Sequence, residues 1–327
     1  MKYKCIIVVI LLLPLFLQPE DFKDVNRGLS VLEINTSPIS STYDGGYGTI
    51  FNFVSSLSDN PAILSNIENL GIKFNHYELG FDMRMDDIII SKNMAKNFGF
   101  MLGISYFDGG EIELRGEIPE DQPIATANFS DFIVSLSGGY RIYKELQVGI
   151  TAKIISQYAY IYSGITSSFS GGVLFCPYIL KGVIISFELD NFGPTMNFGE
   201  SDKILQPSRV KFAIGRRFDI KRFESNIGVS IGGYSKYYIS TDSDSLSFME
   251  SFKNTFIDIP KKVNCKIAVD YLYDGVLNLR SSYVIGGENT IASFGAGLIV
   301  RKIRFDYSYT LEKDTGGSNR FSIGIVY

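Results

Sequence analysis

The side chains that usually carry acid–base or nucleophilic chemistry are scarce in this chain of 327 residues. It contains one histidine, His76, and three cysteines, Cys5, Cys176 and Cys265. A zinc site built from histidine and cysteine needs three or four ligands in one cluster, whereas these four residues are scattered. A nucleophile would have to use His76 as its base, and lone histidines are more often structural. We therefore expect no enzyme activity, no metal site and no cofactor.

Charged side chains are the other candidates for chemistry, and their overall balance is close to neutral. There are 31 Lys and Arg residues against 35 Asp and Glu, a net charge of −4. This argues against a nucleic-acid partner, which would require a basic face. Apolar residues make up 45% of the chain, so it is expected to fold. The 45 Tyr and Phe residues (20 and 25) and 32 Gly are typical of strands and tight turns.

The first residues have the pattern of a secretion signal. Lys2 and Lys4 precede an apolar run from Ile6 to Leu17, and polar residues follow. This run is too short to cross a bilayer of about 30 Å as a helix. We assign residues 1–20 to a signal peptide, and we expect the mature chain to begin between about residues 18 and 30.

The charged residues after the leader must be positioned by strands. From residue 70 onwards, apolar residues alternate with small or polar ones, which predicts strands with two unlike faces. Most segments are about ten residues long, enough to cross a bilayer at a tilt of about 40°. Turn residues divide them into fourteen strands: 70–78, 81–90, 97–107, 130–141, 145–157, 164–177, 181–191, 208–218, 225–236, 262–273, 276–284, 290–300, 302–311 and 320–327.

The predicted connections are sorted by length. Short turns follow every even-numbered strand up to the twelfth, and the longer connections, 108–129, 192–207, 237–261 and 312–319, follow odd-numbered ones. Outer-membrane barrels have this arrangement, with short turns in the periplasm, and a secreted β-sandwich has no reason for it. We therefore predict an all-β fold, a transmembrane antiparallel β-barrel of about 14 strands over residues 70–327. The expected location is the outer membrane of a diderm bacterium, in contact with its lipid.

The alternation also predicts which charged side chains face the lumen. Mixed charges there indicate a hydrated lumen or ion pairs against a plug, and we favour simple cross-pairing over a selectivity device. The expected set is Lys153, Glu188, Asp190, Arg209, Lys211, Lys266, Asp270, Arg280, Arg304 and Asp306.

The last strand carries a candidate assembly signal. Phe321, Ile323, Ile325 and Tyr327 alternate to a terminal aromatic residue. Barrel-assembly machinery recognises its clients by this pattern, so we expect that machinery as a partner.

Residues 28–69 do not follow the strand pattern, because glycine and proline interrupt them. We predict that they form a hatch inside the barrel. The segment contains Asn60, Pro61 and Ala62, followed by Leu64.

This Asn-Pro-Ala-x-Leu element resembles one found in FadL-like outer-membrane proteins, specifically in their PorV/PorQ branch. The resemblance runs from about residue 40 to the C-terminus, although Ser58, Asp59 and Ile63 depart from the family pattern. It implies a fourteen-stranded barrel with an N-terminal hatch. Further similar segments are 102–106, 109–113, 146–153, 189–193 and 206–215.

The resemblance implies two functions. PorV members are accessory proteins of type IX secretion, which suggests a shuttle for protein secretion or surface attachment, with secretion-system proteins or secreted cargo as partners. FadL members carry long-chain fatty acids and other hydrophobic compounds inward. We expect the first function and keep the second as the alternative, because the sequence shows no apolar lumen stripe. A hydrolase that uses His76 is the least favoured hypothesis.

Overall fold

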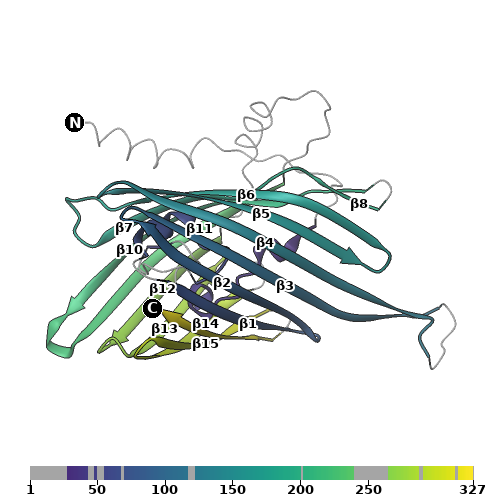
Figure 1. Cartoon of the computed structure of the whole chain (residues 1–327). Coiled ribbons are helices and arrows are strands. Elements are labelled where there is room, and N and C mark those ends of the chain that lie inside the picture. The colour runs from purple at the N-terminus through teal and green to yellow at the C-terminus, as the bar shows by residue number, and fades with distance from the viewer. Residues whose placement is uncertain are drawn as a thin grey trace.

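A closed ring of antiparallel strands forms most of the protein (Figure 1). The computed structural model describes residues 28–42, 48–49, 55–67, 70–116, 122–199, 202–238, 264–286, 290–313 and 316–326. In this part of the chain, no helix is long and apolar enough to cross a membrane. The signal peptide predicted for residues 1–20 and the terminal Tyr327 lie outside the described residues.

Fourteen strands build the barrel, so the predicted fold is confirmed. Sequential strands pair with each other, except that β7 pairs with β10, and β16 closes the ring against β1. The short strands β8 (Met196–Phe198) and β9 (Asp202–Ile204) lie between β7 and β10 in the chain and form a separate hairpin. The barrel strands are β1 (Gly71–Gly80), β2 (Met83–Ala95), β3 (Phe98–Leu114), β4 (Ala125–Tyr143), β5 (Leu146–Ala159), β6 (Tyr162–Phe175), β7 (Val183–Phe192), β10 (Pro207–Ile220), β11 (Ser225–Tyr238), β12 (Asn264–Tyr273), β13 (Leu277–Ile285), β14 (Thr290–Val300), β15 (Ile303–Glu312) and β16 (Ser318–Val326).

The predicted connection at 108–129 was wrong, and residues 239–261 of the predicted connection 237–261 lie outside the described residues. Residues 108–129 are mostly paired strand, because β3 and β4 continue as a two-stranded ribbon beyond their neighbours. The register shifts at Gly109 and Gly110, and Gly110 takes a positive φ of 72°. The rings of Phe107 and Phe129 pack edge to face, with their centroids 5.8 Å apart. Gly109 and Gly110 therefore form a β-bulge within the strand and do not mark its end.

The two faces of the wall have opposite character. On β15, Phe305 and Tyr307 are exposed on the outside, whereas Asp306 and Ser308 are buried on the inside. The same alternation recurs around the ring, so apolar side chains cover the outer face. This is the distribution that a barrel needs in lipid, since only closed hydrogen-bonded walls avoid unpaired backbone groups there.

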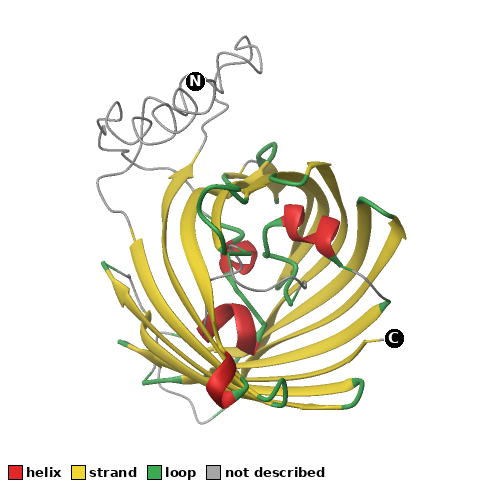
Figure 2. Cartoon of the chain, turned by 90° about the vertical axis from the view of Figure 1, so that its left-hand side faces the viewer, coloured by secondary structure: helices red, strands yellow, loops and turns green. Residues whose placement is uncertain are grey.

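The N-terminal segment lies inside the ring, where Figure 2 shows short helices and loops. Its regular elements are η2 (Ser30–Glu33), α2 (Pro38–Thr42) and η3 (Pro61–Asn66). All three pack against inward-facing strand residues, α2 mainly against β14 and β15 and η3 against β4 and β5. Of the predicted hatch at 28–69, residues 43–47, 50–54 and 68–69 lie outside the described part.

Candidate functional site: the hatch and the lumen

The Asn-Pro-Ala element anchors the hatch to the wall. Asn60 caps η3, because its Oδ1 accepts a hydrogen bond from Ala62 N at 3.0 Å. Its Nδ2 donates to Ser186 Oγ at 2.9 Å and to the Phe187 carbonyl, so the capping residue also binds β7. Pro61 occupies the first turn, where its missing N–H costs nothing. Pro61, Ala62 and Leu64 are all buried.

A row of four glycines receives this element. Gly99 pairs with Gly139, Gly139 with Gly149, and Gly149 with Gly172, so the row crosses β3 to β6. A Cβ at Gly172 would overlap Asn60 Oδ1, and one at Gly149 would overlap the Pro61 carbonyl carbon. The hatch therefore lies directly on strand backbone. We call these residues the glycine row; inward-facing glycines in neighbouring strands are the sequence signal that would have revealed it.

Asp59 joins two of the described hatch pieces. Its carboxylate accepts hydrogen bonds from Ser55 N at 2.6 Å and Ser56 N at 2.9 Å, and from Ser40 Oγ at 2.7 Å. Ser40 belongs to α2, so this buried side chain connects 38–42 to 55–60. The departure from the family pattern at Asp59 thus has a structural role.

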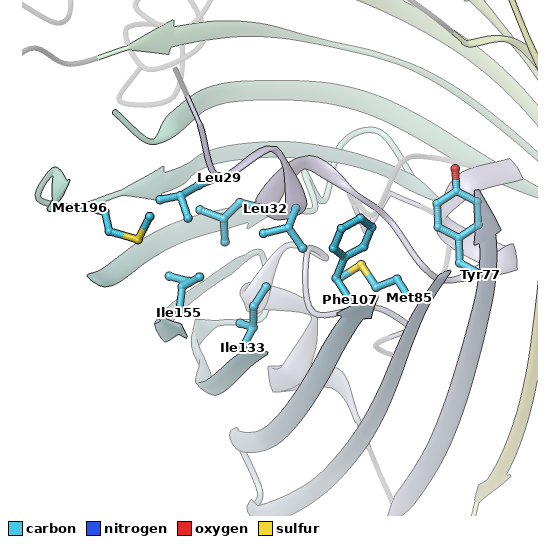
Figure 3. Packing of buried hydrophobic residues seen from close by; sticks show 9 residues of the cluster. Leu29, Leu32, Tyr77, Met85, Phe107, Ile133, Ile155 and Met196 are labelled. Carbon is cyan, nitrogen blue, oxygen red and sulfur yellow. The ribbon is translucent and has the colours of Figure 1, made fainter. Parts of the chain in front are cut away.

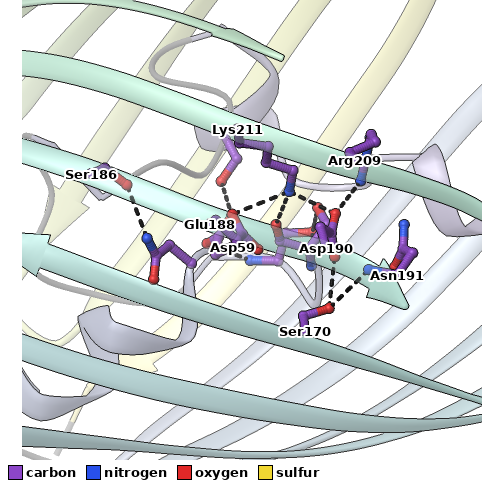
Figure 4. Close-up of polar contacts among 12 residues, drawn as sticks. Asp59, Ser170, Ser186, Glu188, Asp190, Asn191, Arg209 and Lys211 are labelled. Atoms are coloured by element: carbon purple, nitrogen blue, oxygen red, sulfur yellow. Dashed lines mark hydrogen bonds and ion pairs between the residues drawn. The ribbon is translucent and has the colours of Figure 1, made fainter. Parts of the chain in front are cut away.

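Five of the ten predicted lumen charges form one buried cluster (Figure 4). Asp190 lies at its centre and contacts Arg209 at 2.5 Å and Lys211 at 2.7 Å. Both ion pairs join β10 to β7, so they form only because these two strands are neighbours. In the pairing of the two strands, Arg209 lies opposite Asp190 and Lys211 lies opposite Glu188. Lys153 of β5 completes the cluster, 3.4 Å from Asp190 and 2.8 Å from Asn191 Oδ1.

A second cluster holds four more of the predicted charges. Asp306 contacts Arg280 at 2.7 Å and Arg304 at 2.8 Å. Asn278 connects this group to Asp270, because its Nδ2 donates to the Asp270 carboxylate at 2.6 Å and its Oδ1 accepts from Arg280. The tenth predicted residue, Lys266, donates to the Ser41 carbonyl of the hatch.

Cations of the wall bind the hatch through its backbone carbonyl groups. Arg209 donates to Leu32 O at 3.3 Å, and Lys211 donates to Ser58 O at 3.1 Å. Arg320 donates to Asn35 O at 2.8 Å, and its guanidinium lies 3.6 Å from the centre of the Tyr77 ring. Together with Lys266, these side chains attach Leu32, Asn35, Ser41 and Ser58 of the hatch to the wall. Arg320 is not among the predicted lumen residues, although its alternation with Phe321 places it on the inner face.

An apolar stripe lines part of the lumen, although the sequence pattern predicted none. Tyr77 pairs with Met85 and Met85 with Phe107, and Ile133 pairs with Ile155. These five residues belong to one packed apolar cluster, so the stripe crosses β1 to β5. Leu29, Val31 and Leu32 of the hatch and Met196 pack against it (Figure 3). Each strand contributes only one or two of these residues, which is why no single segment of the sequence revealed the stripe.

A cavity of about 450 Å³ lies where this stripe meets the wall cations. Leu79, Met83, Thr290 and Glu312 of its lining are at the strand ends on the long-loop side, so the cavity is in that half of the barrel. Ile34, Leu79 and Met83 line the cavity and also pack on the apolar stripe. The charged lining comprises Arg209, Lys211, Lys236, Lys266 and Arg320 against Glu33 and Glu312.

The sparse nucleophilic residues lie apart from this site. His76 faces outwards from β1, with its Nδ1 2.6 Å from Asp86 Oδ1. Cys176 and Cys265 are free thiols. Cys176 follows β6 in a turn, and burial raises the pKa of its thiol, which makes it less reactive.

Comparison with solved structures adds a fold-level likeness. The Ralstonia pickettii toluene transporter TbuX superposes with a TM-score of 0.57 at 12% identity, over 89% of this chain and 97% of its own. For the Pseudomonas putida toluene transporter TodX, the TM-score is 0.55 at 8% identity, covering 93% and 99%. A Pseudomonas aeruginosa FadL homologue reaches 0.52 at 12% identity, covering 90% and 98%. No protein-family model and no curated protein sequence matches the chain.

At these identities the likeness concerns architecture. The closed barrel, its apolar outer face and these neighbours make the protein an outer-membrane β-barrel with a FadL-like fold. None of the three structures is described as a PorV or PorQ protein.

Proposed function

We propose that this barrel is an outer-membrane channel for hydrophobic and amphiphilic small molecules, with the N-terminal segment as its hatch. The observation that carries the proposal is the cavity of about 450 Å³ between the apolar stripe and the wall cations. The fold-level neighbours include two toluene transporters and a FadL homologue, which favours this function over the secretion role expected from the sequence.

The lining favours an amphiphile with an anionic head, such as a long-chain fatty acid. An apolar tail would be stabilised against Ile34, Leu79 and Met83, which already pack on the stripe. A carboxylate would be stabilised by Lys266 and Arg320. A neutral hydrocarbon would accept no charge-assisted hydrogen bond from these two cations, so it is the less favoured ligand.

The same cations suggest how a ligand would act on the hatch. Lys266 and Arg320 donate to the carbonyl oxygens of Ser41 and Asn35. A carboxylate is a stronger acceptor than a neutral carbonyl, so it would compete for these donors. The bound ligand would thereby weaken the attachment of residues 35–41 to the wall.

Fatty-acid binding to the purified barrel in mild detergent tests the proposal. Oleate is expected to bind, and Lys266→Gln to weaken its affinity about tenfold, as loss of a charge-assisted hydrogen bond would. Lys203→Gln is the matched control, because Lys203 is exposed on the β8–β9 hairpin and should have no effect. Absence of oleate binding, or equal losses in both variants, would contradict the proposed ligand.

A secretion or surface-attachment role is the second candidate, and the β3–β4 ribbon is the observation in its favour. Ile112, Leu114 and Ile124 are exposed there, beyond the last pairing of β3 with β2 at Asp108. An exposed apolar ribbon suits contact with another protein. Removal of residues 110–127 should then impair surface delivery of secreted proteins and leave oleate binding unchanged.

A further inference from the structure

The described residues at the two ends of the barrel differ in charge. Short turns lie at the end where β1 begins and β16 finishes, which is the periplasmic end of an outer-membrane barrel. Among the described residues at this end, nine cations are exposed and only three carboxylates are. The cations are Lys92, Lys96, Lys144, Lys181, Arg216, Lys221, Arg222, Arg301 and Lys302, and the carboxylates are Asp219, Glu224 and Asp274.

The opposite end has no such excess in its described part. Four exposed cations and four exposed carboxylates lie there, and three further acidic residues are half-buried. The cations are Arg84, Arg115, Lys203 and Lys313, the exposed carboxylates are Glu78, Asp82, Glu111 and Glu113, and the half-buried ones are Asp86, Asp108 and Glu312. Among the described residues, the excess of exposed cations is therefore confined to the end with the short turns.

Basic residues lie beside an apolar turn between β6 and β7. Among the described residues, Ile179 and Tyr178 are the most exposed large apolar side chains, at 87% and 80%, and Leu180 beside them is also exposed. Lys181 follows them, and the next residue, Gly182, lies against Arg216 and Arg217. Exposed apolar side chains next to cations are typical of a surface that enters the boundary between lipid headgroups and acyl chains.

The turn between β10 and β11 extends this surface. Lys221, Arg222 and Phe223 form the short helix η4 (Lys221–Phe223), and all three are exposed. Arg216 lies over the Phe218 ring at 4.8 Å, and Arg222 lies over Phe223 at 5.7 Å. We call Tyr178–Lys181, Arg216, Phe218 and 221–223 the basic rim.

We propose that the basic rim binds anionic phospholipid headgroups of the periplasmic leaflet. Cations at a membrane surface are attracted to anionic lipid, and the aromatic and aliphatic residues beside them insert at headgroup depth. Lys181, Arg216, Lys221 and Arg222 contact the phosphate groups, and the apolar turn contacts the first acyl carbons. This inference concerns the outer surface and stands apart from the proposed function of the lumen.

Lipid retention by the full-length barrel tests this binding. The purified protein in mild detergent is mixed with equimolar phosphatidylglycerol and phosphatidylcholine, and the retained lipids are counted by native mass spectrometry. Phosphatidylglycerol should be preferred, and the triple variant Arg216→Gln, Lys221→Gln, Arg222→Gln should reduce that preference at least about tenfold. The control variant Arg115→Gln, Lys203→Gln, Lys313→Gln changes the charge equally at the other end and should retain the preference.

Three outcomes would overturn the proposal: no preference in the unmodified protein, an unchanged preference in the rim variant, or equal losses in both variants. Heat-modifiable migration in gels confirms that each variant is folded. Oleate binding should be the same in both variants, so failure of this inference is distinct from failure of the channel proposal.

Discussion

At the residue scale, the glycine row is where we expect one added methyl group to disturb the hatch. Gly172→Ala places a methyl group against Asn60 Oδ1, so the cap of η3 and its contact with β7 must shift. We expect the hatch to loosen, with higher ion conductance in planar bilayers and greater sensitivity of cells to bulky antibiotics.

The neighbouring residue supplies the control for this prediction. Gly171 has open space where a Cβ would be, so Gly171→Ala should leave conductance unchanged. Equal conductance of the two variants would show that contact between Asn60 and the wall does not seal the lumen.

At the element scale, the pairing of β7 with β10 brings the central charge cluster together. Asp190→Asn removes the carboxylate shared by Lys153, Arg209 and Lys211, and it leaves Glu188, 3.3 Å from Lys211, as the remaining carboxylate of the cluster against three buried cations. The free energy of unfolding should fall by about 3–5 kcal/mol, measured by urea titration of the barrel in lipid vesicles.

An exposed ion pair is the comparison for that variant. Glu113→Gln breaks the contact with Arg115 on the β3–β4 ribbon, at 2.7 Å but open to solvent. Its cost should be at most about 1 kcal/mol. If both variants lost the same stability, burial of the cluster would not be what makes Asp190 important.

At the scale of the whole molecule, the apolar outer face determines how the barrel sits in lipid. Ile154 is 60% exposed in the middle of β5, and Ile161 is 67% exposed in the turn that follows. Ile154→Arg should lower the stability of the barrel in vesicles by about 2–4 kcal/mol, since it places a charge near the bilayer centre. Ile161→Arg should cost at most about 1 kcal/mol, because the turn reaches the interface; similar costs would contradict this placement of the bilayer.

Several features of this protein were predictable from the sequence. The period of two assigned Lys153, Asp190 and Arg280 to the inner face and located fourteen strands, because side-chain direction alternates locally along a strand. The predicted end of β3 and the predicted start of β4 were wrong, because Gly109 and Gly110 permit a bulge as readily as a turn.

Only the tertiary structure decided how residues on different strands meet. The sequence by itself determined the barrel and its two faces, since both follow from repeated local alternation. The glycine row, the apolar stripe and the contacts of Lys266 and Arg320 with hatch carbonyls depend on the register between strands and on where the described hatch residues lie in the lumen. Each strand contributes one or two residues to these features, so they form only when the wall closes around the hatch.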